Sequence, residues 1–254
     1  MDIQTAVLDG VQTIEIARPG KKNALTMAMY EAMTDALQRA DADVAVRAVL
    51  ITGQPGVFTA GNDLEDFLQS PPDGPDAPVF RCMQALIQCG KPVVAAVTGT
   101  AIGIGTTMLL HCDLAYASDE ARFGLPFTRL GLVPEFASSL LLPLRAGHVR
   151  AAEKLLLGEP FGAADALEMG LVNDLLPAGE VLAHARRVAG RFNALPAAAV
   201  RETKQLLRRG QAQAVQDALA AEVEGFVRRL RSAEAGEALQ AFFDKRAPDF
   251  SRFR

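Results

Sequence analysis

The sequence predicts an α/β body followed by a C-terminal helical extension. Short apolar runs bounded by glycine or proline, such as residues 48–52 and 92–98, have the length and the Val/Ile/Ala content of buried strands. Amphipathic helical patterns alternate with these runs, and from Gly179 onward only helical patterns remain. Strands that alternate with helices are typical of an α/β fold, and the purely helical end is an addition to it.

Composition and length agree with one large domain, or one domain with an appendage. The chain has 254 residues, of which 50% are hydrophobic and 22% charged, as in a soluble globular protein. A net charge of −4 gives no general attraction to nucleic acid, and no apolar run approaches the ~20 residues that span a bilayer. Three cysteines without C-x-x-C spacing suit free thiols in a reducing compartment. Because the start also lacks a signal-peptide pattern, we expect a cytoplasmic protein that binds neither nucleic acid nor membrane.

The N-terminal part is expected to hold a hairpin, a strand and three helices, one of which begins near Leu64. Asp9-Gly10 is a favoured two-residue turn between alternating apolar and polar residues. Thr26 has the residue type of an N-cap for a helix that runs through Ala40. The strand at 48–52 follows, and after it come a Pro-rich loop at 70–78 and a helix at 80–89. Such a loop suits a variable flap at a site as well as a flexible excursion.

Two glycine corners follow two of the expected strands. Residues 58–64 come after the strand at 48–52, and residues 99–105 lie between the strand at 92–98 and a helix expected from 106 to 111. A strand that turns into a helix leaves unpaired N–H groups, which suit a phosphate, a developing oxyanion or merely a tight packing corner. The glycine spacing matches neither G-x-G-x-x-G nor a P-loop. Two corners that each offer one N–H are what a polarised carbonyl oxygen needs.

The remaining elements are mostly helical. Helices are expected at 150–157 and 162–168, a short strand at 171–176, and then helices at 181–194, 196–209, 212–231 and 232–245. Apolar faces on an all-helical tail are typical of a segment that covers a neighbouring subunit.

Short motifs spread over nearly the whole chain resemble the crotonase (enoyl-CoA hydratase/isomerase) superfamily. They are Arg18-Pro19, Asn23-Ala24-Leu25, Phe58-Thr59-Ala60-Gly61-Asn62-Asp63-Leu64, Gly99-x-Ala101-x-Gly103, Cys112-Asp113-Leu114, Ala121-Arg122-Phe123, Gly131-Leu132-Val133-Pro134 and Phe242-Phe243-Asp244-Lys245-Arg246. The resemblance implies a β-β-α spiral core (the ClpP/crotonase fold) over residues 1–194 and a helical oligomerisation region over 195–254. It also implies homotrimers or dimers of trimers.

The resemblance further implies an acyl-CoA thioester as the substrate, with coenzyme A as part of that substrate and with no separate cofactor or metal. The thioester oxygen is expected to accept hydrogen bonds from the N–H groups of Ala60 and Ile104. Residues expected to bind the substrate are Lys22, Ala24, Leu25, Ala60, Gly61, Asn62, Asp63, Leu64, Gly103, Ile104, Phe127, Pro134 and Lys245.

The reaction depends on where carboxylates stand. Hydratases of the family use two glutamates, and the matching positions here are Thr107 and Phe127. Because hydration needs one group to position water and another to protonate the α-carbon, ordinary hydratase activity is not expected.

Glu135 is the candidate catalytic residue. It follows Pro134 and precedes Phe136-Ala137-Ser138-Ser139, which resembles a segment of peroxisomal-type Δ3,Δ2-enoyl-CoA isomerases whose glutamate moves the proton. Phe136 stands where those enzymes have Gly, and its bulk could narrow the acyl pocket or turn Glu135 away. We expect an enoyl-CoA isomerase. The alternative functions are a hydratase, another crotonase reaction and a silent acyl-CoA-binding subunit. The alternative role of Glu135 is that of a solvent-facing carboxylate at a helix start.

Other polar residues are expected to have structural roles. Asp63 suits the N-cap of a helix from Leu64, and Ser138 and Ser139 suit capping of the next helix more than lining the pocket. His111 and Cys112 are expected on one strand, where neighbouring side chains point to opposite faces and make no joint site.

Overall fold

The computed structural model describes residues 2–253, which form two sheets and surrounding helices. The larger sheet has the strand order β1-β2-β3-β5-β7-β10 and the smaller one β4-β6-β8-β9. The strands of the larger sheet are β1 (Ile3–Leu8), β2 (Val11–Ile16), β3 (Ala48–Thr52), β5 (Val93–Val97), β7 (Leu114–Ser118) and β10 (Asp174–Leu176). Those of the smaller sheet are β4 (Val57–Thr59), β6 (Thr100–Ile102), β8 (Arg122–Gly124) and β9 (Phe161–Gly162).

The chain alternates between the two sheets. β3, β5 and β7 of the larger sheet are each followed by one strand of the smaller sheet and then by a helical segment. This repeated β-β-α turn confirms the spiral core of the crotonase fold. The four strands of the smaller sheet have two or three residues each, too few for a periodic pattern in the sequence.

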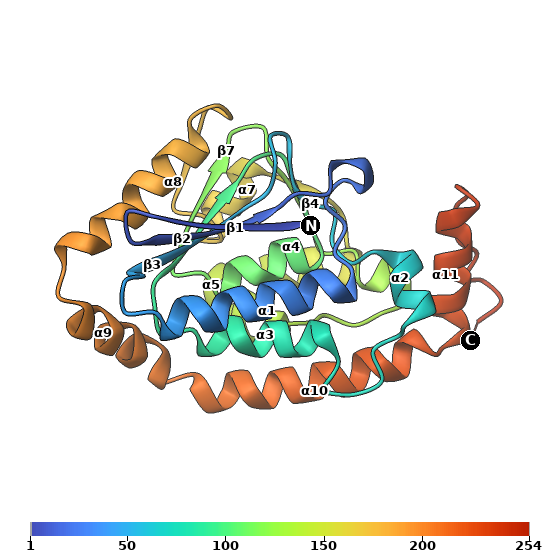
Figure 1. Ribbon diagram of the computed structural model, residues 1–254. Coiled ribbons are helices and arrows are strands. Elements are labelled where there is room, and N and C mark those ends of the chain that lie inside the picture. Colours follow the sequence, from blue (N-terminus) through green and yellow to red (C-terminus); the bar gives the residue numbers. More distant parts are fainter. Residues whose placement is uncertain (1, 254) are drawn as a thin grey trace.

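Helices cover both faces of the larger sheet (Figure 1). Alternate residues of β3 belong to different cores: Val49 and Ile51 lie in the core with α1, and Ala48 and Leu50 lie in the core with α8. A strand buried on both faces is apolar throughout, which explains the continuous run in the sequence. The helices are α1 (Met27–Ala42), α2 (Leu64–Gln69), α3 (Pro78–Gln88), α4 (Ile104–Thr107), α5 (Ser138–Ala146), α6 (His148–Leu157), α7 (Ala163–Glu168), α8 (Val181–Gly190), α9 (Ala197–Arg209), α10 (Ala212–Leu230) and α11 (Ala233–Phe243).

Several local expectations are confirmed. β1 and β2 form the expected hairpin, with positive φ at both turn residues, Asp9 (47°) and Gly10 (69°). The Thr26 side chain caps α1 by accepting a hydrogen bond from the Met29 N–H. Asp63 caps α2 by accepting from the N–H groups of Glu65 and Asp66.

Other expectations were wrong in detail. The helix expected at 106–111 begins earlier, as α4, and continues as a 3₁₀ turn over Met108–Leu110. His111 and Cys112 are not on a strand, because β7 begins at Leu114. The helix expected over 181–194 is α8 followed by a 3₁₀ turn at Arg191–Ala194.

The C-terminal helices run around the body, with α9 and α10 along its lower edge and α11 at the right in Figure 1. α9 is anchored by Lys204, whose Nζ lies 2.6 Å from the Asp113 carboxylate and 2.5 Å from the Lys91 carbonyl oxygen. α10 runs beside α3, where Gln216 and Gln84 are hydrogen-bonded. Among residues 2–253, no helix is long and apolar enough to cross a membrane. The domain division at residue 195 and the subunit-covering role of these helices stay predictions.

Candidate active site

The two glycine corners lie against each other. The first corner includes the end of β4 and the second includes β6, and these two strands of the smaller sheet are parallel neighbours. Parallel neighbours end at the same edge of a sheet, so the turns that follow them meet there. Gly61 has φ +90°, and a Cβ atom at this position would lie 2.8 Å from the Ile102 carbonyl oxygen. The close approach of the two corners therefore requires glycine at position 61.

One of the two expected N–H donors is already engaged. The Ala60 N–H donates to the Lys22 carbonyl oxygen at 3.0 Å, so the expectation that it holds a thioester oxygen was wrong. The free N–H belongs instead to Asn62, which pairs with Leu25 in a parallel bridge. That bridge uses the Gly61 carbonyl and the Asp63 N–H on one side of the chain and leaves the Asn62 N–H on the other.

The second donor is available as expected. Ile104 is the first residue of α4, so its N–H has no acceptor within the helix. Within the described part of the chain, neither the Asn62 nor the Ile104 N–H has a hydrogen-bond acceptor. One N–H from each corner is therefore free.

A cavity of about 570 Å³ opens beside the corners. The expected site residues on its wall are Lys22, Ala24, Ala60, Gly61, Asn62, Asp63, Leu64, Gly103, Phe127 and Glu135. Leu25, Ile104, Pro134 and Lys245 are not on the wall. The sequence did not predict the other wall residues, which include Phe67, Leu132, Phe226, Leu230, Leu239, Phe242 and Phe243. Many of these come from α10 and α11, so the C-terminal helices close the cavity; the apolar faces of those helices were the available signal.

Glu135 is a buried carboxyl on the cavity wall. It is 2% exposed, and neither oxygen has a hydrogen-bond partner within residues 2–253. Burial raises the pKa of Glu135 to about 8, and the nearby Glu222 carboxylate adds to the rise. The Asn62 amide is close enough to oppose this change without making a well-formed hydrogen bond. The alternative of a solvent-facing carboxylate at a helix start was therefore wrong.

The other carboxylates on the cavity wall have partners. Asp63 lies 2.6 Å from the Arg18 guanidinium, besides capping α2. Glu65 is an exposed side chain that pairs with Lys21 at 3.0 Å. At the two positions where hydratases have glutamates, Phe127 lies on the cavity wall and Thr107 is fully buried with an unpartnered hydroxyl. Glu135 is thus the one wall carboxyl that is free to exchange a proton with a ligand.

Asn62 is itself held by a residue of α1. The Tyr30 hydroxyl donates to the Asn62 side-chain oxygen, and Tyr30 is fully buried. Burial raises the pKa of Tyr30 well above its usual value, and the charge of Glu135 adds to the rise, so the hydroxyl keeps its proton and stays a donor.

Phe136 does not enter the pocket. It has φ 62°, a left-handed conformation that directs the side chain into the core, where it is 2% exposed and stacks on the His111 ring. His111 Nε2 lies 2.7 Å from the Phe136 carbonyl oxygen. Burial lowers the pKa of His111 to about 3, so the ring is neutral and Nε2–H is the donor. The expectation that Phe136 narrows the pocket or turns Glu135 away was wrong.

Glu222, rather than a serine, caps α5. The N-cap residue of α5 is Ala137, which makes no side-chain cap bond. The Glu222 carboxylate on α10 accepts from the Ala137 N–H at 2.5 Å and from the Ser139 N–H at 2.9 Å. The Ser138 hydroxyl donates to the Glu135 carbonyl oxygen, so the expectation of serine caps was wrong. No local pattern in the sequence points to a cap from so distant a residue.

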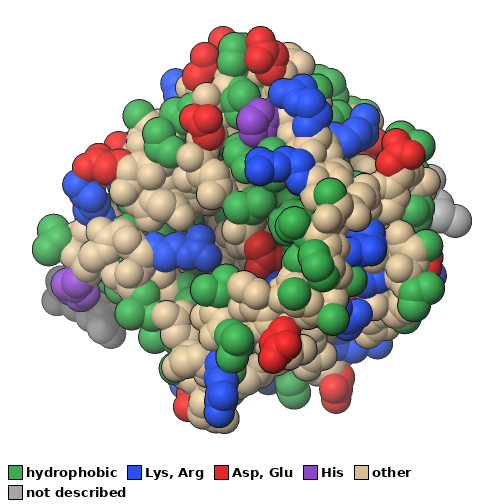
Figure 2. All heavy atoms as spheres, turned by 90° about the vertical axis from the view of Figure 1, so that its left-hand side faces the viewer, with side chains coloured by type: hydrophobic (Ala, Val, Ile, Leu, Met, Phe, Trp, Pro, Cys, Tyr) green, Lys and Arg blue, Asp and Glu red, His purple; other side chains and the backbone are tan. Residues whose placement is uncertain are grey.

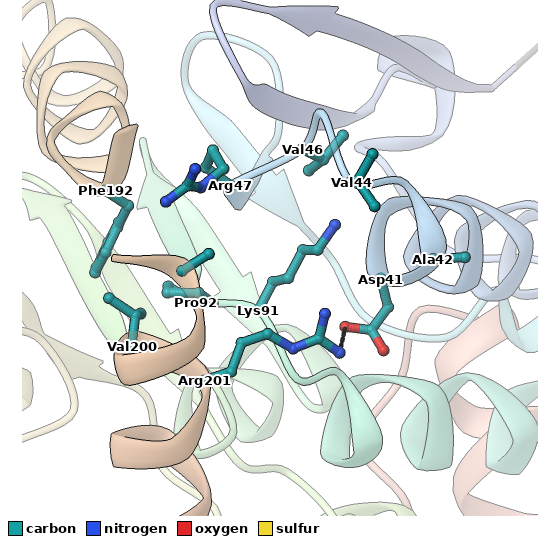
Figure 3. Close-up of a pocket in the computed structure, with 11 residues that line it drawn as sticks. Asp41, Ala42, Val44, Val46, Arg47, Lys91, Pro92, Phe192, Val200 and Arg201 are labelled. Atoms are coloured by element: carbon teal, nitrogen blue, oxygen red, sulfur yellow. Dashed lines mark ion pairs between the residues drawn. The ribbon is translucent and has the colours of Figure 1, made fainter. Parts of the chain in front are cut away.

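A second, smaller cavity lies between α9 and the body (Figure 3). Three cationic side chains surround its 160 Å³, and each has a partner in the chain. Arg47 donates to the Leu195 carbonyl, Lys91 donates to the carbonyls of residues 40 and 43, and Arg201 pairs with Asp41 at 3.6 Å. On the face shown in Figure 2, basic and acidic side chains are interspersed. We interpret this cavity as part of the packing contact between α9 and the body, without a ligand-binding role.

Known proteins resemble the chain over its whole length. The family model described as enoyl-CoA hydratase/isomerase matches residues 7–252. The chain is 33% identical over 255 residues to the probable enoyl-CoA hydratase echA8 of Mycobacterium leprae, with 99% of each chain covered. It is 31% identical over 252 residues to the peroxisomal enoyl-CoA delta isomerase 3 of Mus musculus, with 97% of this chain and 79% of that one covered. The solved structure of Pseudomonas aeruginosa OdaA has a TM-score of 0.93 at 49% identity and covers 95% of this chain and 98% of that one.

Proposed function

Since the chain belongs to the enoyl-CoA hydratase/isomerase family, we propose that this acyl-CoA enzyme is a Δ3,Δ2-enoyl-CoA isomerase with Glu135 as its proton carrier. The observation that carries the proposal is the position of Glu135. It is the one unpartnered carboxyl on the wall of a cavity that also holds the two glycine corners, within the part of the chain that the structure describes.

The chemistry needs one group that first accepts and then returns a proton. The ionised Glu135 takes a proton from C2 of a 3-enoyl thioester, and the electrons move into a dienolate with its negative charge on the thioester oxygen. The N–H groups of Asn62 and Ile104 stabilise that oxygen. Glu135 then returns the proton to C4, which leaves the double bond between C2 and C3. A pKa of about 8 suits a group that must be both base and acid near neutral pH.

The cavity wall suggests how the substrate lies. Lys21 and Lys22 are exposed on the wall next to the first corner and suit the phosphates of coenzyme A. The apolar wall formed by α10 and α11 suits an acyl chain. Assembly into trimers or hexamers and a cytoplasmic location stay predictions.

The main alternative is a hydratase, which is favoured by the names of relatives such as the Mycobacterium leprae protein. Hydration needs a second acid–base group, and the chain has Thr107 and Phe127 where that chemistry would be placed. A silent acyl-CoA-binding subunit is the other alternative.

The test is incubation of the purified protein with 3-enoyl-CoA and, separately, with 2-enoyl-CoA, followed by mass spectrometry and by the absorbance of the conjugated product. We expect conversion of the 3-enoyl ester without a change in mass. The Glu135→Gln variant, which keeps the shape of the side chain, should lose about 10²–10⁴-fold in kcat.

Glu31→Gln is the matched control, because Glu31 is an exposed carboxylate on α1 that pairs with Arg81 outside the cavity. It should retain the wild-type rate. A product heavier by one water from the 2-enoyl ester would replace the isomerase assignment by hydratase. Binding of both esters without turnover would support the silent subunit.

A further inference from the structure

We infer that Glu222 on α10 is a positioning residue for Glu135: it fixes the left-handed turn that directs Glu135 into the cavity and places a second negative charge beside it. This inference rests on the proposed function, in which Glu135 carries the proton.

The turn after Glu135 needs contacts from other parts of the chain to keep its conformation. Phe136 and Ala137 both have side chains and both adopt positive φ, 62° and 54°. This region is unfavourable for residues with a Cβ atom and persists only where the surroundings fix it. His111 fixes the carbonyl side of the turn through the Phe136 oxygen, and Glu222 fixes the N–H side.

Glu222 spans the end of the turn and the beginning of α5. One of its oxygens accepts from the Ala137 N–H and the other from the Ser139 N–H. Burial raises the pKa of Glu222, and the two N–H hydrogen bonds together with the helix dipole oppose that rise and stabilise the carboxylate. Because both oxygens take part in these hydrogen bonds, the Glu222 side chain is held in one orientation. It is also buried, with 6% of its surface exposed.

Within residues 2–253, no cationic side chain neutralises the carboxyl groups of Glu135 and Glu222. No ion pair within residues 2–253 involves Glu135 or Glu222. The titratable groups around them are neutral at pH 7: Tyr30 on α1 and Cys82 on α3 have raised pKa values, and burial lowers the pKa of His111 to about 3. The remaining charge near Tyr30 is the carboxylate of Asp66, which accepts from the Met27 N–H and is also negative. No cation among the described residues therefore offsets the negative charge of Glu222, which acts on Glu135 in the direction that makes Glu135 a stronger base.

The position of Glu222 on α10 has a consequence for substrate binding. The same helix supplies Phe226 and Leu230 to the cavity wall. One helix thus contacts both the space for the ligand and the turn that holds the base.

Two substitutions separate charge from geometry. Glu222→Gln keeps the length of the side chain but removes the charge, so the acid limb of the kcat/KM profile should move to lower pH by about one unit. On the plateau above the acid limb, its kcat should fall because the ionised Glu135 is a weaker base, while KM changes little. Glu222→Asp keeps the charge but is too short to reach both N–H groups, so kcat should fall with the acid limb near its wild-type position.

A direct titration makes the test independent of the reaction. Infrared difference spectra of the full chain follow the protonated Glu135 carboxyl against pH, with Glu135→Gln as the blank, and thermal denaturation checks the fold of each variant. A lower Glu135 pKa in Glu222→Gln supports the inference, and an unchanged pKa together with an unchanged kcat overturns it. Absence of isomerisation by the wild type would overturn the proposed function instead, and the infrared titration would still decide the role of Glu222.

Discussion

Residues 58–64 and residues 135–139 both bend sharply at the cavity wall, but they bend in different ways. The first segment turns at Gly61, with φ +90°, where a side chain would collide with the neighbouring corner. The second turns at Phe136 and Ala137, which have side chains and are held in the left-handed region by His111 and Glu222. The first bend is therefore made by the local sequence, and the second is made by tertiary contacts.

The difference follows from what each segment presents. The glycine corner presents backbone N–H groups, and a backbone donor is placed correctly as soon as the chain has the right φ and ψ. The second segment presents a carboxyl that must be buried without a partner, at a cost in free energy. Contacts from the rest of the fold, including the cap on α5, are what keep Glu135 in this position.

Among the variants that disturb one of these two bends, Gly61→Ala is expected to have the largest effect, because it breaks the bend made by the local sequence. A Cβ atom 2.8 Å from the Ile102 carbonyl oxygen forces the two corners apart and moves the Asn62 N–H. Loss of one oxyanion donor typically costs about 10²–10³-fold in rate, so kcat/KM for the 3-enoyl ester should fall by that factor.

Gly56→Ala is the control for Gly61→Ala. Gly56 also has positive φ, +84°, but a Cβ atom there would meet nothing within 4 Å. It should destabilise the chain by the backbone strain alone and leave the rate near that of the wild type. Equal losses of kcat/KM in the two variants would show that strain, rather than the contact between the corners, controls the site.

How far the sequence predicts the structure follows the same division. The Asp9-Gly10 hairpin, the Thr26 cap, strand β3 and the two glycine corners depend on neighbouring residues, and all were predicted correctly. The choice of Asn62 over Ala60 as a free donor depends on the bridge to Leu25, which joins distant parts of the chain.

The surroundings of Glu135 could not be predicted for the same reason. The sequence placed the residue but assigned the cap to Ser138 and Ser139, because the real cap, Glu222, lies on a helix far along the chain. The burial of the Phe136 side chain depends on its stacking against the His111 ring, and no spacing in the sequence relates these two residues. These contacts arise only when the helices pack.

A smaller effect is expected from His111→Phe, which breaks the bend made by tertiary contacts. Phenylalanine keeps the stacking on Phe136 but leaves the buried Phe136 carbonyl without its donor. The free energy of unfolding at pH 7 should fall by about 1–3 kcal/mol. Urea denaturation measures this change, and kcat should fall as well because the turn loosens.

The pH dependence gives the same variant a second readout. The pKa of His111 is about 3 in the folded protein against 6.5 when it is unperturbed, so in the wild type only the unfolded state binds this proton between those values. The free energy of unfolding of the wild type therefore decreases as the pH is lowered below 6.5. The difference in this free energy between the wild type and His111→Phe should become smaller by about 1.4 kcal/mol for each pH unit. A gap that does not change with pH would mean that His111 is protonated in the folded state.

The smallest effect is expected from Tyr30→Phe, where the two segments meet. The Tyr30 hydroxyl holds the Asn62 amide, which belongs to the glycine corner and faces Glu135. Without it the amide can turn its oxygen toward Glu135, so the acid limb of the kcat/KM profile should move to higher pH, opposite to the shift expected for Glu222→Gln. One hydrogen bond is worth about 1 kcal/mol, which corresponds to roughly a fivefold loss of kcat/KM at pH 7.

Tyr116→Phe is the control, because it removes the other tyrosine hydroxyl of the chain, which lies outside the cavity. It should change neither the position of the acid limb nor kcat/KM at pH 7. An unchanged acid limb in Tyr30→Phe would show that Asn62 is oriented by the backbone of its own corner.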